Sequence, residues 1–178
     1  EDAYCVMLQT GSILLQYPRI LRVGAGRRYI NPIHEVPVGK NGETGGPLIP
    51  GVTVVHDATD RSRLYQRMKE VDIPILEHIA ELPTSTHEEH AAKARAIAFL
   101  GQTYEVLAEE VKREPGSVWL SYKMAAMAYY WRRSELEGDP EDVNYALFHY
   151  LNIAEAIGFY NHEELIVRLE PLVEIDPR

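Results

Sequence analysis

His87 and His90 have the spacing that most resembles a metal site. They lie three residues apart with two glutamates between them, so on a helix both imidazoles face the same side. A metal site needs further ligands, and the sequence holds neither an HExxH pattern nor an ExxH pair. His34 and His56 would add ligands only if the fold brought them close. We therefore predict no metal and no cofactor, and interpret His87 and His90 as part of a solvated helix start.

Nucleophilic catalysis has one cysteine available, Cys5, and a single cysteine forms neither an internal disulfide nor a cysteine-rich zinc site. It lies in an apolar run, residues 3–8, where a buried and unreactive thiol is expected. No G-x-S-x-G serine motif occurs. Adjacent carboxylates on a helix point apart, so these pairs are interpreted as solvated surface: Glu109 and Glu110, Glu141 and Asp142, Glu163 and Glu164. The residue types thus argue against an enzyme.

A loop at residues 23–28 combines two glycines with the adjacent Arg27 and Arg28. The backbone N–H groups and guanidinium groups of such a loop can contact a phosphate, although the third glycine of a nucleotide-binding motif is absent. Arg19 and Arg22 add positive charge nearby. We predict that these four arginines contact a phosphate or a partner protein, with a plain turn as the alternative.

Trp131, Arg132 and Arg133 follow two tyrosines in an apolar segment. Tryptophan and arginine are enriched where protein surfaces bind each other. We predict that these three residues form an interface near the end of a helix, whereas the two preceding tyrosines belong to the core.

That helix belongs to the clearest pair of elements, residues 117–158. Apolar side chains occupy nearly every face of its first helix, which predicts a central helix surrounded by neighbours. Ser117 is expected to cap this helix and Gly138 to close it in the left-handed conformation. Asp139 should cap the second helix, with Pro140 in its first turn.

Further helices are expected on both sides of this pair. An apolar stripe over residues 64–82 predicts one helix, which Pro74 should kink. Thr86 and Glu89 match a capping box at the start of the next, and Asn161 and the glutamate three residues later match one at the start of the last. A stripe of small residues should let a neighbouring helix approach closely: Ala91, Ala94, Ala98, Gly101 and Ala108.

Residues 1–62 have a different character. Short runs rich in Val, Ile, Leu and Tyr predict strands or extended segments at residues 3–23, and one more strand at residues 52–56. Between them, four prolines and five glycines at residues 31–51 exclude a continuous regular element. We predict an extended, Gly/Pro-rich N-terminal arm with short strands over 1–62, and a helical domain over 63–178.

The net charge of −9 at pH 7 falls on the helical part of the 178-residue chain. Residues 1–62 hold six basic and six acidic residues, and residues 63–178 hold 12 basic and 21 acidic ones. An acidic surface repels phosphate backbones, which disfavours nucleic acid as a partner of the helices. The sequence has no run of about 18 apolar residues that would predict a membrane span.

We therefore predict a mainly α protein, with about five helices in a bundle or a stack of helical hairpins behind the extended arm. Its predicted function is that of a non-catalytic structural or interaction subunit of a larger assembly, such as a virion or a multi-subunit complex. The arm would pack on other protein subunits of an oligomer or hetero-complex, in the cytoplasm or a virion-like assembly rather than in a secreted protein. The alternative is an enzyme or a small-molecule-binding subunit with a His-lined, metal-binding pocket between arm and helices.

Overall fold

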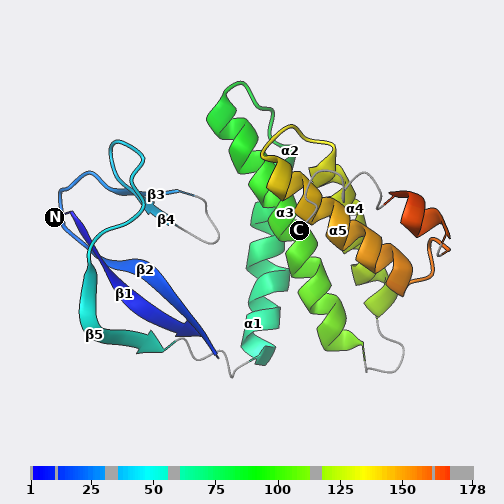
Figure 1. Cartoon of the computed structure of the whole chain (residues 1–178), viewed down its shortest axis with the longest axis horizontal. Helices are drawn as coiled ribbons and strands as arrows, with labels where there is room; N and C mark the ends of the chain where they lie inside the picture. Colours follow the sequence, from blue (N-terminus) through cyan, green and yellow to red (C-terminus); the bar gives the residue numbers. More distant parts are fainter. Residues whose placement is uncertain are drawn as a thin grey trace. The chain divides into compact units, whose positions relative to one another are not determined.

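The computed structural model describes residues 2–10, 12–30, 36–55, 61–112, 118–161 and 163–168. The chain is mainly helical and begins with a region of short strands, as predicted (Figure 1). It divides into two compact units, Glu1–Arg67 and Met68–Arg178. None of the helices in these described ranges has the length and apolar character needed to cross a bilayer.

The N-terminal unit contains two small sheets. Three strands form the larger sheet in the order β2-β1-β5, with β2 antiparallel and β5 parallel to β1. Two strands form an antiparallel pair. The strands expected within residues 3–23 are thus confirmed. In chain order the strands are β1 (Ala3–Thr10), β2 (Ile13–Leu21), β3 (Arg28–Ile30), β4 (Val36–Val38) and β5 (Leu48–Val55).

Strand β5 begins earlier than the sequence predicts and includes Pro50 and Gly51. The register between β1 and β5 shifts between Cys5 and Met7, which leaves extra residues on β5. Pro50 and Gly51 fall in this irregular part, and Gly51 has a φ of 75° that favours glycine. Because β5 is at an edge of the sheet, a proline does not interrupt pairing on both sides.

The loop after β4 is held against β1. The backbone N–H of Cys5 donates to the carbonyl oxygen of Pro47 at 2.9 Å, and a Cβ on Gly46 would collide with the carbonyl oxygen of Ala3. Glycine at position 46 therefore permits the close approach. Cys5 is buried, as expected. Since these strands pair with one another, the extended arm predicted for this region is not confirmed.

Helical backbone runs without interruption from Arg61 to Glu81 and contains a π-helical segment before Pro74. Proline has no N–H and its ring clashes with the preceding turn, so a wider turn accommodates it. The extra residue of a π turn also rotates the helix that follows. The apolar residues predicted to form one stripe over residues 64–82 therefore do not share one face. The buried residues of the second α-helix include Ile73, Leu76 and Ala80, whereas Val71 is exposed. The three elements are α1 (Arg61–Arg67), η1 (Met68–Asp72) and α2 (Ile73–Glu81).

Three longer helices complete the second unit, and helices adjacent in the chain pack against each other: α2 on α3, α3 on α4 and α4 on α5. A further helical turn covers residues 163–168. The arrangement as a bundle or as a stack of hairpins stays a prediction. The longer helices are α3 (His87–Val111), α4 (Trp119–Ser134) and α5 (Pro140–Ala156).

The helix starts follow the predicted caps. At α3, the Thr86 side chain accepts from the Glu89 N–H at 3.2 Å and the Glu89 carboxylate accepts from the Thr86 N–H at 3.0 Å. At α5, the Asp139 side chain accepts from the Glu141 N–H at 2.9 Å, with Pro140 in the first turn. Asn161 and its partner three residues later make both bonds of a capping box. Ser117, the expected cap of α4, lies outside the described residues.

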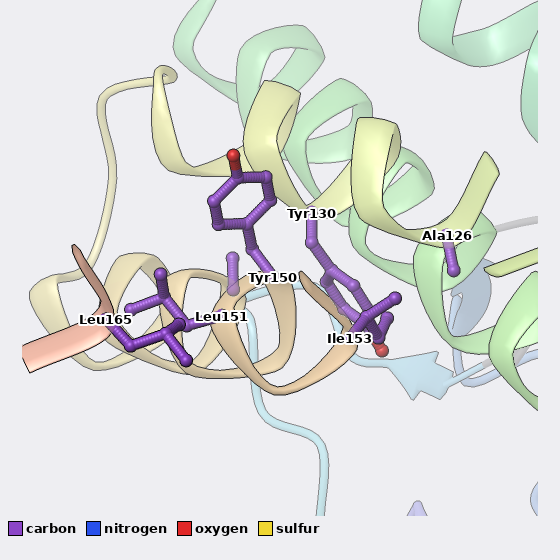
Figure 2. Packing of buried hydrophobic residues seen from close by; sticks show 7 residues of the cluster. Ala126, Tyr130, Tyr150, Leu151, Ile153 and Leu165 are labelled. Atoms are coloured by element: carbon purple, nitrogen blue, oxygen red, sulfur yellow. The ribbon is translucent and has the colours of Figure 1, made fainter. Parts of the chain in front are cut away.

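A cluster of buried side chains joins α4 to α5 and to the turn at 163–168. Figure 2 shows Tyr130 of α4 beside Ile153 of α5, and Leu165 against Leu151. Helix α3 approaches α4 closely where Gly101 meets the Tyr130 ring, because a Cβ at this position would lie 2.9 Å from two ring carbons. The small-residue stripe of α3 thus has its predicted use here, at Gly101.

Two expectations for α4 are wrong. The helix packs between α3 and α5, yet it is not covered on every face, since Leu120 and Met124 are about half exposed. Gly138 does not close it in the left-handed conformation, because Gly138 is not among the glycines with positive φ. Its lack of a side chain serves another purpose: a Cβ there would lie 3.0 Å from Nη2 of Arg133.

Candidate functional site

A cleft of about 400 Å³ lies in the helical unit between α3 and the turn that joins α4 to α5. The first half of α3 forms one wall, and the turn with the start of α5 forms the other. Side chains from both walls and from the end of α4 line it: His87, His90, Ala91, Ala94, Arg95, Ala98, Phe99, Gln102, Arg133, Glu137, Gly138, Asp139, Asp142 and Tyr145.

The α3 wall is positioned by the cap of that helix. The Glu89 carboxylate accepts from the Ser85 N–H at 2.7 Å, from the Ser85 hydroxyl at 2.8 Å and from the Thr86 N–H. The Ser85 backbone hydrogen bond is the main reason that the pKa of Glu89 falls to about 2. Glu89 therefore stays ionised and keeps the first turn, with His87 and His90, in place.

The opposite wall is organised by Arg133, which is buried with 3% of its surface exposed. Its Nη2 donates to Asp142 Oδ2 at 3.3 Å and its Nη1 to the Leu136 carbonyl at 3.4 Å. One guanidinium thus connects the end of α4, the turn and the first turn of α5. Gly138 leaves the space that this guanidinium occupies.

Tyr145 connects the cleft to a polar network behind it. The Gln102 side chain donates to the Tyr145 hydroxyl at 3.4 Å, and the Tyr145 ring contacts the His149 ring with 4.3 Å between centroids. In turn, one oxygen of Glu105 accepts from the Tyr130 hydroxyl and pairs with His149 Nδ1, each at 3.0 Å. The network therefore joins α3, α4 and α5.

A carboxylate bound to a histidine is the arrangement that orients a general base, which makes Glu105 and His149 a candidate catalytic pair. Three aromatic rings surround the His149 imidazole, those of Tyr130, Tyr145 and Phe148. Burial, and then Glu105, raises the pKa of the Tyr130 hydroxyl far above its ordinary range. Tyr130 stays neutral and donates to Glu105, which fits a packed polar core better than a reactive site.

A second tyrosine–glutamate cluster lies between α2, α3 and α4. The hydroxyls of Tyr104 and Tyr129 both donate to Glu77 Oε1 at 3.2 Å, and the two rings stack with centroids 5.7 Å apart. Burial is the main cause that raises the pKa of Tyr129 to about 12 and the pKa of Tyr104 further. This cluster fixes α2 on the other two helices.

Of the four histidines weighed as metal ligands, the structure places two at the cleft. His87 and His90 both line the cleft, while His34 and His56 lie outside the described residues. No group of three or more His, Cys, Asp or Glu in the described part of the chain is placed to hold a metal ion. A metal site therefore has no support in this geometry.

The four arginines predicted to contact a phosphate or a partner lie on or beside β2 and β3. Arg27 donates to two carbonyl oxygens of the loop between β4 and β5, those of Glu43 at 3.2 Å and Gly45 at 3.1 Å. The Arg19 guanidinium lies 4.9 Å from the centre of the Tyr17 ring. Arg22 follows β2 and Arg28 begins β3. Arg27 thus connects the segment before β3 to the loop between β4 and β5. Contact of the four arginines with a phosphate or a partner stays a prediction.

The predicted interface residues of α4 have different environments. The Trp131 ring is 41% exposed and packs against the Tyr150 ring. Arg132 donates to Glu81 Oε1 at 2.7 Å and to the Ala80 carbonyl at 2.8 Å, which joins α4 to the end of α2. Arg133 is buried at the cleft wall. An interface role for the three stays a prediction, although two of them already bind within the helical unit.

The sequence interpretation missed Arg95, Glu105, Glu137 and His149. The spacing of Tyr145 and His149, four residues apart on an apolar helix, places both on one side of that helix and is a signal for a polar row. In comparisons with known proteins, no family model and no curated sequence matches the chain.

Proposed function

We propose that this chain is a non-catalytic subunit of a larger protein assembly, and that the N-terminal unit contacts the other subunits. The observation that carries the proposal is a row of apolar side chains across the three-stranded sheet, in which Leu8 is half-buried and the others are exposed. Leu15 on β2, Leu8 on β1 and Val54 on β5 are paired neighbours and therefore share one face.

Alternation along the strands adds Ile13 and Val52 to this face, which we call the apolar sheet face (Leu8, Ile13, Leu15, Val52 and Val54). Ile13 is 58% exposed and Leu15 51% exposed. Apolar side chains exposed on a small sheet are typical of a surface that binds protein.

The edges of the sheet offer a second mode of contact. β2 is a nine-residue strand with β1 on one side, and within the described strands nothing pairs with its other side. An unprotected edge with apolar side chains favours pairing with a strand of another chain. A second copy presents the same edge, so two copies can pair around a twofold axis.

The helical unit fits the same role as a rigid body. Consecutive helices pack on each other in chain order, which supports a stack of two hairpins, α2 with α3 and α4 with α5. Two of its carboxylates, Glu77 and Glu105, accept hydrogen bonds from tyrosine hydroxyls and so join its helices to one another.

Sedimentation velocity of the full chain, over about 1 to 100 μM, tests the proposal. We expect the average mass to rise with concentration, and a double change on the apolar sheet face, Ile13→Lys with Leu15→Lys, to weaken association at least tenfold, because lysine protects exposed strands from pairing. Val106→Lys is the matched control, since Val106 is an exposed apolar residue on α3. Circular dichroism verifies that each variant folds.

Two results would overturn the proposal. One is a chain that stays monomeric throughout while the amides of β1 and β2 exchange as slowly as those of α3, because the sheet face would then be covered within the chain itself. The other is an equal loss of association in Val106→Lys.

A further inference from the structure

The two walls of the cleft in the helical unit carry different polar groups. His87, His90 and Arg95 come from α3, and Glu137, Asp139 and Asp142 come from the turn and the start of α5. Two of these carboxylates are already engaged, because Asp142 binds Arg133 and Asp139 caps α5. Arg95 and Glu137 are the charged side chains left to face the cleft from its two walls.

The side chains of Arg95 and Glu137 make no hydrogen bond or ion pair with any residue of the described ranges. In this they differ from other charged side chains of the unit, such as Arg132, which pairs with Glu81 at 2.7 Å. In addition, Nε2 of His90 is buried and has no hydrogen-bond partner among the described residues. A buried nitrogen without a partner is rare in folded proteins and requires an explanation. A ligand that brings its own polar groups to the cleft supplies one.

Apolar side chains line much of the rest of the cleft. Three alanines of α3, Ala91, Ala94 and Ala98, line it together with the rings of Phe99 and Tyr145. Its volume of about 400 Å³ is within the range of small-molecule sites. The cleft thus combines an apolar floor with a cation on one wall and an anion on the other, neither of which pairs with a residue of the described ranges.

We infer that this cleft binds an α-amino acid as a zwitterion, a property that goes beyond the proposed assembly role. The Arg95 guanidinium takes the ligand carboxylate, for which its planar donors are suited. The Glu137 carboxylate takes the ammonium group, and His90 Nε2 completes its hydrogen bonding with the ligand. The alanine floor and the two rings accept an apolar side chain.

The test is a titration of the full chain with each of the twenty proteinogenic L-amino acids, up to about 10 mM, since ligands of so few atoms bind weakly. The readout is the NMR signal of the His90 ring in histidine-labelled protein. The tightest ligand is then compared with its N-acetyl derivative, which lacks the ammonium group, and its amide, which lacks the carboxylate. We expect both derivatives to bind at least tenfold more weakly than the parent.

Two variants assign the charges. Arg95→Gln should weaken the parent amino acid about tenfold or more and abolish the difference between parent and amide. Glu137→Gln should do the same for the difference between parent and N-acetyl derivative. Glu141→Gln and Lys112→Gln are matched controls, because each changes the net charge equally at an exposed position that does not line the cleft. Both controls should bind like the original chain.

Several outcomes would overturn the inference. They are no change of the His90 signal with any of the twenty amino acids, equal binding of one derivative and its parent, or equal weakening by a variant and its control. If the amide alone binds as well as the parent, the cleft takes cations and not zwitterions. Self-association is measured separately on the sheet variants, so this inference and the proposed assembly role can fail independently.

Discussion

The two halves of α3 show how one helix can be closed on one part of its length and open on another. Its second half is covered by α4, where Gly101 meets the Tyr130 ring and Glu105 accepts from the Tyr130 hydroxyl. Its first half carries the same kind of small-residue stripe, but alanines there border a cleft. The difference teaches that small residues permit close helix packing without requiring it. Close packing occurs at Gly101, where the Tyr130 ring of α4 fills the space that the small residue leaves.

The largest effect should come from filling the closed half. Gly101→Ala should overpack the helical unit at a cost of roughly 1–3 kcal/mol, because the new Cβ would lie 2.9 Å from the Tyr130 ring. The gain of about 1 kcal/mol that alanine brings in helix propensity offsets part of this cost, so we expect a net destabilisation of up to about 2 kcal/mol. Urea unfolding followed by helical circular dichroism measures the change.

The matched substitution in the open half is Ala91→Leu. Ala91 is exposed at the cleft, so we expect a change within about 0.5 kcal/mol of zero. If Ala91→Leu destabilises the unit as much as Gly101→Ala does, the two halves are equally packed and the comparison fails.

A smaller effect should follow from removing the hydrogen bond that closes the second half. Tyr130→Phe should cost about 1 kcal/mol, because it removes one buried hydrogen bond and leaves Glu105 with His149 alone. Tyr145→Phe, at an exposed ring with a longer 3.4 Å contact, is the control and should cost less.

Alkaline titration adds a second measurement on the same hydroxyl. Burial, followed by Glu105, raises the pKa of Tyr130 in the folded chain. The unfolded chain therefore ionises this tyrosine first, and its stabilising effect is complete below pH 10 and is lost as the pH rises above 10. In Tyr130→Phe, the free energy of unfolding measured in urea should therefore fall less steeply between pH 9 and about 11. An unchanged slope would mean that Tyr130 ionises in the folded state as it does in solvent.

The smallest effect should be a local one at the start of α3. The pKa of Glu89 is lowered to about 2 by its bonds to Ser85 and Thr86. For a carboxyl with a depressed pKa, the stabilising contribution is complete above the unfolded value of about 4.5 and is lost as the pH falls toward 2. We expect the amides of the first turn to exchange faster over that window, while the amides near Gly101 do not.

Glu89→Gln provides the control for this acid effect. A glutamine keeps the capping geometry without a titrating proton, so the pH dependence of the first-turn amides should disappear. If the whole of α3 loosens together at low pH, its open half depends on tertiary packing as much as its closed half does.

Local features of this fold could be predicted from the sequence, because they depend on residues close in the chain. Thr86 with Glu89, and Asp139 before Pro140, specify their helix starts through side-chain bonds to backbone N–H groups two or three residues away. The strands at residues 3–21 could also be predicted, because short apolar runs there are separated by turn residues.

Features that depend on distant residues could not be predicted in this way. The π segment before Pro74 rotates α2 by the width of one extra residue, which periodicity over a straight helix cannot anticipate. The burial of Lys123 and Arg133 depends on Glu109 and Asp142 from neighbouring helices, at 2.8 and 3.3 Å. The cleft itself exists only because α4 ends where it does, so its walls come from residues some 40 positions apart.

The chain has two tryptophans, Trp119 and Trp131, and α4 carries both. Trp131 packs against Tyr150 of α5, while Trp119 begins the helix. The intrinsic tryptophan emission of the whole chain therefore originates in a single helix of the second unit, and the sheet unit contributes none. Fluorescence follows the helical unit alone, so a difference between its melting curve and that of the β-strand signal measures how far the two units unfold independently.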